Sequence, residues 1–105
     1  MTVPYFRRPT NTENIYEDID QLKAYKSNRR HLLEAACRLS QISVNEVMTE
    51  TKSFDRSAKR FRVMYLLRGL GLSYPLIGML LNRHYSSVIH GVQVVKRQLE
   101  GSLGS

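Results

Sequence analysis

Residues 73–95, SYPLIGMLLNRHYSSVIHGVQVV, carry the strongest structural signal in this chain of 105 residues. Ser73 can cap a helix, Gly78 would let another helix approach closely, and Asn82 can take the left-handed turn that ends the helix. One of the two serines that follow can cap a second helix, in which valines recur at helical spacing. Two short helices, a tight polar turn and a buried valine early in the second helix are the pattern of a helix-turn-helix.

The remainder of the chain also has helical spacing, and no run alternates between apolar and polar residues as a strand would. Ser43 with Glu46 three residues later is a capping-box pattern, which predicts a short helix ending near Met48. The other expected helices span residues 13–25, 29–39 and 56–68. We therefore predict an all-α fold, a small helical bundle of about five or six helices that contains a helix-turn-helix.

The domain organisation expected from these patterns is simple. Residues 1–12 hold two prolines and no periodicity, so they predict a flexible N-terminal arm. Residues 13–100 form one helical domain with the helix-turn-helix at 73–99. The end of the chain, 101–105, is expected to be a disordered tail, and its Gly-Ser-Leu-Gly-Ser sequence could be a remnant of cloning.

The composition excludes several classes of protein. With 42% hydrophobic and 24% charged residues the chain is of ordinary globular type, and no apolar run approaches the ~20 residues of a bilayer span. A single cysteine excludes an internal disulfide, and one cysteine with three scattered histidines does not make a zinc site. The first twenty residues lack an apolar core behind a basic start, so we expect no secretory signal. We expect a cytoplasmic protein, associated with the nucleoid, with no metal, cofactor, membrane or small-molecule substrate.

The net charge of +7 is distributed unevenly. Residues 1–51 hold seven basic and seven acidic side chains, whereas residues 52–105 hold nine basic and two acidic. Such an asymmetry creates a positive field suited to a polyanion, although a well-solvated surface would give the same count. The cations expected to contact phosphates gather before and within the helix at 56–68: Lys52, Arg56, Lys59, Arg60 and Arg62. The alternative is that their long stems cover apolar surface.

The second helix of the helix-turn-helix carries polar side chains around its N-terminus. Their hydrogen-bonding and stacking groups have the reach needed for base edges and phosphates. A helix-turn-helix places these positions in the major groove of DNA. The candidate residues are Arg83, His84, Tyr85, Ser86, Ser87, His90 and Gln93. The alternative is a helical hairpin with a polar, solvated face.

Four segments also resemble a known family: Ile42-Ser43-Val44, VMYLLR at 63–68, LSYPLIG at 72–78 and RHYSSVIHG at 83–91. Together they make residues from about 35 to 99 similar to the C-terminal DNA-binding domain (domain IV) of the bacterial chromosomal replication initiator, DnaA. In that family the last segment reads roughly R-D-H-[ST]-T-V-[LI]-H-A. His84 therefore stands where the family has an acidic base reader, and Tyr85 where it has a histidine.

The resemblance implies roles for individual residues. Phosphate contacts are implied for Arg60, Ser73, Ser87 and His90, and base contacts for the residues that lead into the second helix, of which Ser86 matches in type. Tyr74, with the proline after it, occupies the position at which the family packs the start of the first motif helix on the DNA backbone. The chain has no G-x-x-x-x-G-K-[ST] loop, so the resemblance does not extend to the initiator's ATPase.

Sequence-specific binding of double-stranded DNA is the function these observations favour, in a transcriptional regulator or a replication accessory factor. Residues 1–40 are a candidate surface for a partner protein or for self-association. Two alternatives stay open: a module that docks an acidic protein such as an RNA polymerase or replication subunit, and single-stranded nucleic acid binding. Ser86 or Ser87 could form a nucleophile–base pair with His90, which lies one helical turn away. No carboxylate is expected nearby to orient the histidine, so we expect no enzyme.

Overall fold

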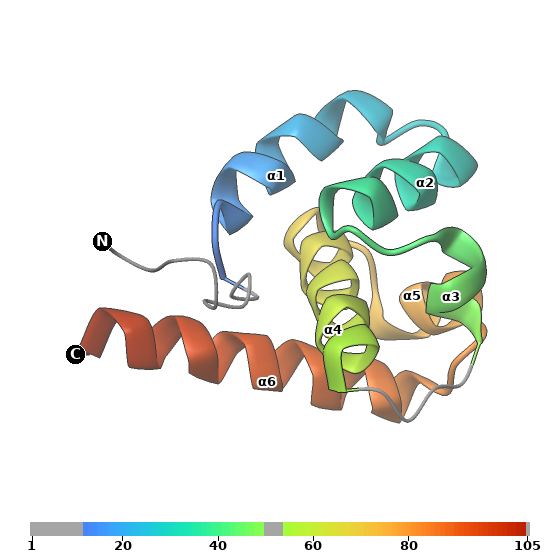
Figure 1. The fold of residues 1–105 in the computed structure, drawn as a ribbon. Coiled ribbons are helices and arrows are strands. Elements are labelled where there is room, and N and C mark those ends of the chain that lie inside the picture. Colours follow the sequence, from blue (N-terminus) through green and yellow to red (C-terminus); the bar gives the residue numbers. More distant parts are fainter. Residues whose placement is uncertain (1–11, 50–53, 105) are drawn as a thin grey trace.

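The structure is a computed structural model, which describes residues 12–49 and 54–104. Over these residues it is all-α and contains no strand, as the sequence predicts (Figure 1). The elements are α1 (Ile15–Leu22), the 3-10 turn η2 (Lys23–Tyr25), α2 (Arg29–Leu39), α3 (Val44–Met48), α4 (Phe54–Gly69), α5 (Tyr74–Leu81) and α6 (Tyr85–Gly104). None of the described helices is both long and apolar enough to cross a membrane.

Several helix ends are fixed by the local chemistry that the sequence indicates. The Ser43 hydroxyl accepts the Glu46 N–H (3.0 Å) while the Glu46 carboxylate accepts the Ser43 N–H (3.1 Å), which completes the capping box of α3. Ser73 accepts the Leu76 N–H (3.3 Å) and caps α5. Asn82 ends α5 in the left-handed region at φ 56°.

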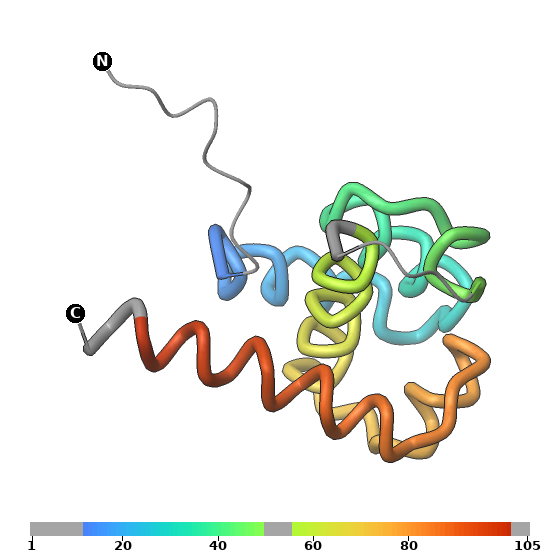
Figure 2. The backbone as a smooth tube through the Cα atoms, turned by 60° about the horizontal axis from the view of Figure 1, so that its bottom comes forward, coloured from blue at the N-terminus to red at the C-terminus, as the bar shows by residue number. Residues whose placement is uncertain are grey.

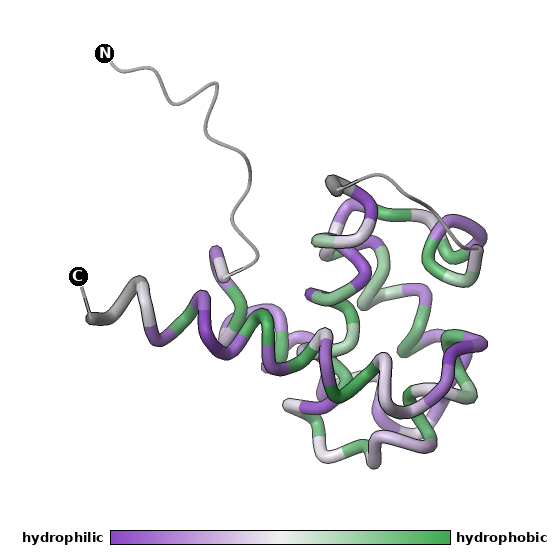
Figure 3. The backbone as a smooth tube through the Cα atoms, turned by 90° about the horizontal axis from the view of Figure 1, so that it is seen from below, coloured by the Kyte–Doolittle hydropathy of each residue, from purple (hydrophilic) through white to green (hydrophobic). Residues whose placement is uncertain are grey.

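The hydrophobic core lies between α4 and the helices around it. In Figure 1, α4 runs through the middle of the molecule, α1 and α2 lie on one side of it, and α6 crosses on the other. The longest helix, α6, packs mainly against α4 and α5. Fully buried side chains come from every helix, among them Ile15, Leu32, Val47, Leu66, Ile77 and Val88. Apolar and polar segments alternate along the helices in Figure 3, as amphipathic helices around one core require.

The crossing of α4 and α6 depends on a glycine. A Cβ added at Gly91 would lie 2.5 Å from the Met64 sulfur and 2.7 Å from Cδ1 of Phe61. A side chain at this position would force the side chains of Met64 and Phe61 to move, because real Cβ atoms do not approach other atoms so closely. Gly91 therefore leaves room for these two side chains where α6 packs against α4.

Two predicted boundaries differ from the structure. Helix α6 begins at Tyr85, before the serines expected to cap it, and it continues to Gly104, through most of the expected disordered tail. The buried side chain of Leu99 anchors the end of the helix to the core, and each further residue then adds a helical hydrogen bond at little cost. The predicted N-terminal arm, apart from Thr12, lies outside the described residues, as does Lys52.

Candidate nucleic-acid interface

A three-residue turn, 82–84, joins α5 to α6 at the end of the molecule opposite the C-terminus of α6 (Figures 1 and 2). The Gly78 carbonyl accepts the Arg83 N–H (2.8 Å) and the Met79 carbonyl accepts the Asn82 N–H (3.3 Å), which is a Schellman motif. A Cβ at Gly78 would lie 2.5 Å from the Arg83 carbonyl oxygen. A small residue is therefore needed at Gly78 because the backbone of the turn passes over it. The sequence had suggested that a small residue here allows another helix to approach.

His84, and not Ser86 or Ser87, caps α6. Its Nδ1 accepts the Ser86 N–H (3.1 Å), and the Ser86 hydroxyl lies 2.8 Å from the same nitrogen. Serine is the commoner capping residue, but here an imidazole nitrogen one residue ahead of the helix reaches the N–H that a serine oxygen would bind. The cap holds the first turn of α6 in place.

The residues 83–87, which we name the α6 tip, are mostly exposed. The rings of His84 and Tyr85 stack with their centroids 4.5 Å apart and an angle of 29° between the planes. Tyr85 is 48% exposed although it is a large aromatic residue. The tip thus presents two stacked rings and two exposed serines to solvent.

Beside the tip lies a hollow of about 350 Å³ between α4 and α6. Arg83, Ser86, Ser87 and His90 line it from the α6 side, and Arg60, Phe61 and Met64 line it from α4. The edge of the His90 ring meets the Phe61 ring at a centroid distance of 5.6 Å and an angle of 88°. Five of the predicted site residues therefore border one hollow, although they come from two helices and the turn between α5 and α6.

The two arginines of this α4–α6 hollow are held by one carbonyl oxygen. Arg60 Nη2 donates to the Thr49 carbonyl at 3.2 Å, and Arg83 Nη2 donates to the same oxygen at 2.8 Å. Thr49 directly follows α3, so the residue that ends this short helix binds both guanidinium groups through its carbonyl oxygen. A guanidinium has five N–H donors, so a bond to this carbonyl is compatible with a contact to a bound anion.

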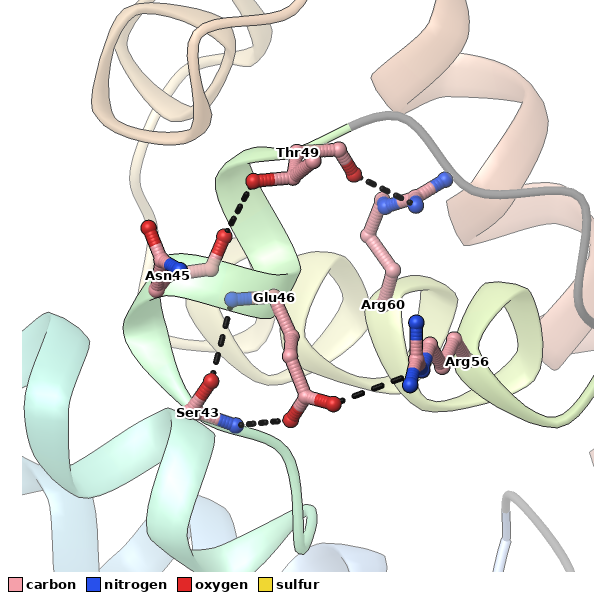
Figure 4. A network of polar contacts seen from close by, with 6 residues as sticks. All are labelled: Ser43, Asn45, Glu46, Thr49, Arg56 and Arg60. Carbon is pink, nitrogen blue, oxygen red and sulfur yellow. Dashed lines mark hydrogen bonds and ion pairs between the residues drawn. The ribbon is translucent and has the colours of Figure 1, made fainter.

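Figure 4 shows how α3 also fixes the start of α4. The Glu46 carboxylate that completes the capping box lies 3.3 Å from Nε of Arg56. Hydrogen bonds from Ser43 lower the pKa of Glu46, with smaller contributions from the charges of Arg56 and Lys59. Arg56 therefore has a structural partner in addition to any phosphate contact, and Lys59 lies partly exposed on the same helix.

The prediction that Arg62 contacts phosphate is wrong. Its side chain is 8% exposed, and Nη2 forms an ion pair with the Asp18 carboxylate at 2.6 Å. The same nitrogen donates to the Glu13 carbonyl, and Nη1 donates to the Leu39 carbonyl and the Ser40 hydroxyl. Asp18, which the sequence placed among the solvated acids of the first helix, is buried as the partner. Arg62 ties α4 to α1 and α2 and faces the interior.

A second hollow, of about 380 Å³, lies where α2 begins near the start of α5. Lys26, Arg29 and Ser73 line it above a floor of leucines (Leu32, Leu70, Leu72 and Leu76). Neither Lys26 nor Arg29 forms an ion pair with a residue that the structure describes. The charge pattern of the sequence does not indicate these two cations, because they belong to the half of the chain with no net charge. We name this surface the α2–α5 hollow.

Tyr74, implied as a backbone contact, is engaged within the molecule. The Arg68 guanidinium lies over its ring, 4.6 Å from the centroid, and Arg68 Nη1 also donates to the Leu72 carbonyl at 2.9 Å. These contacts hold the start of α5 against the end of α4.

Comparisons of the chain with protein-family models, with curated proteins and with solved structures give no match. Among the residues that the structure describes, no three histidine, cysteine or acidic side chains gather as a metal site would require. The α6 tip and the two hollows are the surfaces of the described residues from which a function can be proposed.

Proposed function

We propose that this chain binds double-stranded DNA sequence-specifically, with α5 and α6 as a helix-turn-helix and the α6 tip in the major groove. The observation that carries the proposal is that the exposed tip borders a hollow lined by Arg60, Arg83 and His90. A helix-turn-helix reads bases with the first residues of its second helix, while neighbouring side chains bind the backbone.

The two parts of the surface suit different contacts. His84, Tyr85 and Ser86 protrude at the N-terminus of α6, where they would reach base edges. The α4–α6 hollow lies beside them, and its guanidinium groups, hydroxyls and imidazole can bind a phosphate, which is an acceptor with a negative charge. Ser73, Lys26 and Arg29 at the other hollow would add contacts to the backbone. Arg62 takes no part.

The resemblance of RHYSSVIHG and LSYPLIG to the initiator's DNA-binding domain supports the same proposal. We propose a role as a transcriptional regulator or as a replication accessory factor. A module of this kind acts by occupying a site on DNA, and no residue of the surface is assigned a catalytic role.

The test is selection of bound fragments from a pool of random duplexes, followed by titration of the best duplex with salt. We expect one enriched motif, and an affinity for the duplex that exceeds its affinity for either single strand. Each cation that neutralises a phosphate should add about −0.9 to the slope of log K against log salt concentration. The absence of any enriched motif, or equal affinity for single strands, would overturn the proposal.

A further inference from the structure

The cap on α6 fixes which nitrogen of His84 carries the proton. Nδ1 accepts the backbone N–H of Ser86 (3.1 Å), so this nitrogen must offer a lone pair. The Ser86 hydroxyl, 2.8 Å from the same nitrogen, then acts as a second donor. In a neutral imidazole with an unprotonated Nδ1, the proton is on Nε2. The outer nitrogen of this ring is therefore a hydrogen-bond donor and cannot accept.

The ring is also held in one orientation. The cap restrains one edge, and stacking on Tyr85, 4.5 Å between centroids, restrains one face. His84 is exposed, and no residue that the structure describes forms a hydrogen bond with Nε2. One oriented N–H donor thus stands at the N-terminus of α6, the part of the helix that the proposed function places against base edges.

In the major groove a single donor separates cytosine from the other three bases. Guanine presents two acceptors there, N7 and O6, adenine presents N7, and thymine presents O4. Cytosine presents only its N4 amino group, which is itself a donor. A donor facing that amino group would leave two N–H groups without acceptors, which costs free energy in a site that excludes water.

From this geometry, and resting on the proposed function, we propose that His84 is a specificity-determining residue that selects an acceptor-bearing base. Guanine is preferred at the position it reads, and cytosine is rejected. This base preference follows from the helix cap. The Ser86 N–H donates to Nδ1 of His84, so the proton of the neutral ring stays on Nε2.

The decisive variant is His84→Asp, which keeps the cap and reverses the polarity of the contact. Aspartate is a good N-cap, since one carboxylate oxygen can accept the Ser86 N–H. Its second oxygen then presents an acceptor, which pairs with the cytosine amino group. His84→Asn also keeps the cap but offers both a donor and an acceptor, so it should favour adenine. Arg30→Ala, at an exposed position of α2 outside both hollows, is the control.

The experiment is selection from random duplexes at about pH 8, where an imidazole is ordinarily neutral, with the wild-type chain and the three variants. Circular dichroism establishes that each variant is folded. We expect one position of the motif to change from guanine to cytosine in His84→Asp, with about tenfold discrimination, the lower part of the range for a good side chain–base pair. Every other position, and the whole motif of Arg30→Ala, should stay unchanged.

A second measurement tests the contact without altering the protein. Replacing the selected guanine by 7-deazaguanine removes the N7 acceptor, and the wild-type chain should then bind more weakly while His84→Asp is unaffected. If the wild-type chain and His84→Asp enrich the same base at every position, the inference about His84 is overturned and duplex binding still stands. If the wild-type chain enriches no sequence and does not prefer duplexes, the proposed function fails and the inference fails with it.

Discussion

Arg60 and Arg62 are both predicted from the sequence to contact phosphates, but in the structure they have different partners. Both are 7% exposed, yet Arg60 reaches Thr49 beside the α6 tip and Arg62 reaches Asp18 on α1. Positions two apart in a helix lie about 200° apart around its axis, so the two side chains cannot serve one face. Helical periodicity could have separated them, but the partner of Arg62 is 44 residues away in the chain and no local pattern indicates it.

Replacing Arg62 tests this assignment. Arg62→Ala would leave the Asp18 carboxylate buried without its counter-charge, so we expect the free energy of unfolding to fall by about 3–5 kcal/mol, measured by urea denaturation. The double variant Arg62→Met with Asp18→Leu should recover most of that loss, because it removes both charges together. A phosphate role would give the opposite result: little loss of stability and a clear loss of duplex affinity.

Cys37 provides a second prediction for one residue. Burial raises the pKa of its thiol to about 12, so roughly one thiol in ten thousand is ionised at pH 8. Only the thiolate reacts with iodoacetamide, so alkylation of the folded chain should be very slow and should become fast in urea. Rapid alkylation without denaturant would show that the packing between α2 and the core is looser than described.

The helices themselves were largely predictable, because their ends are set by local chemistry. The bounds of α2, the capping box of α3 and the left-handed Asn82 follow from residues within one turn of each end. The cap of α6 was missed because histidine is not among the preferred capping residues, and only the coordinates show that its Nδ1 reaches the Ser86 N–H. That one cap changes which residues remain exposed at the tip.

Two glycine-to-alanine variants test the connection between α5 and α6. Gly78→Ala should lower the free energy of unfolding by about 1–3 kcal/mol, because its Cβ meets the Arg83 carbonyl oxygen of the turn. It should also weaken duplex binding, since the turn positions the α6 tip. Gly101→Ala is the matched control: a Cβ there contacts nothing within 4 Å, so the change should stabilise α6 by about 0.5–1 kcal/mol. Thermal unfolding separates the two, and equal stabilisation by both would contradict the tight turn.

Across the whole molecule, the difference in charge between the two halves of the chain predicts only part of the proposed binding surface. Five of the predicted site residues, all from the basic half, do meet at the α4–α6 hollow. Yet Arg62 of that half is interior, Arg56 pairs with Glu46, and Lys26 and Arg29 of the neutral half line a hollow with Ser73. Folding brings residues that are distant in the sequence to a shared surface, so the charge of each half of the sequence does not give the charge of each surface.

The salt dependence of binding tests whether Lys26 and Arg29 contact the phosphates of DNA. Lys26→Ala with Arg29→Ala should make the slope of log K against log salt shallower by about 1.8, because two phosphate contacts are lost. Arg30→Ala with Arg38→Ala removes the same charge from exposed positions of α2 that line neither hollow, and should change the slope much less. Equal changes in the two double variants would show that only net charge matters and that the α2–α5 hollow makes no specific contact.

Contact of the α6 tip and the hollow beside it with duplex DNA can be measured from the backbone amide resonances of the 15N-labelled chain during titration with a selected duplex. We expect the largest shifts on residues 82–90, with smaller shifts at Ser73 and at the start of α2. Shifts confined to the exposed face of α1, or to the second half of α6, would contradict this contact, as would an unchanged spectrum in the presence of excess duplex.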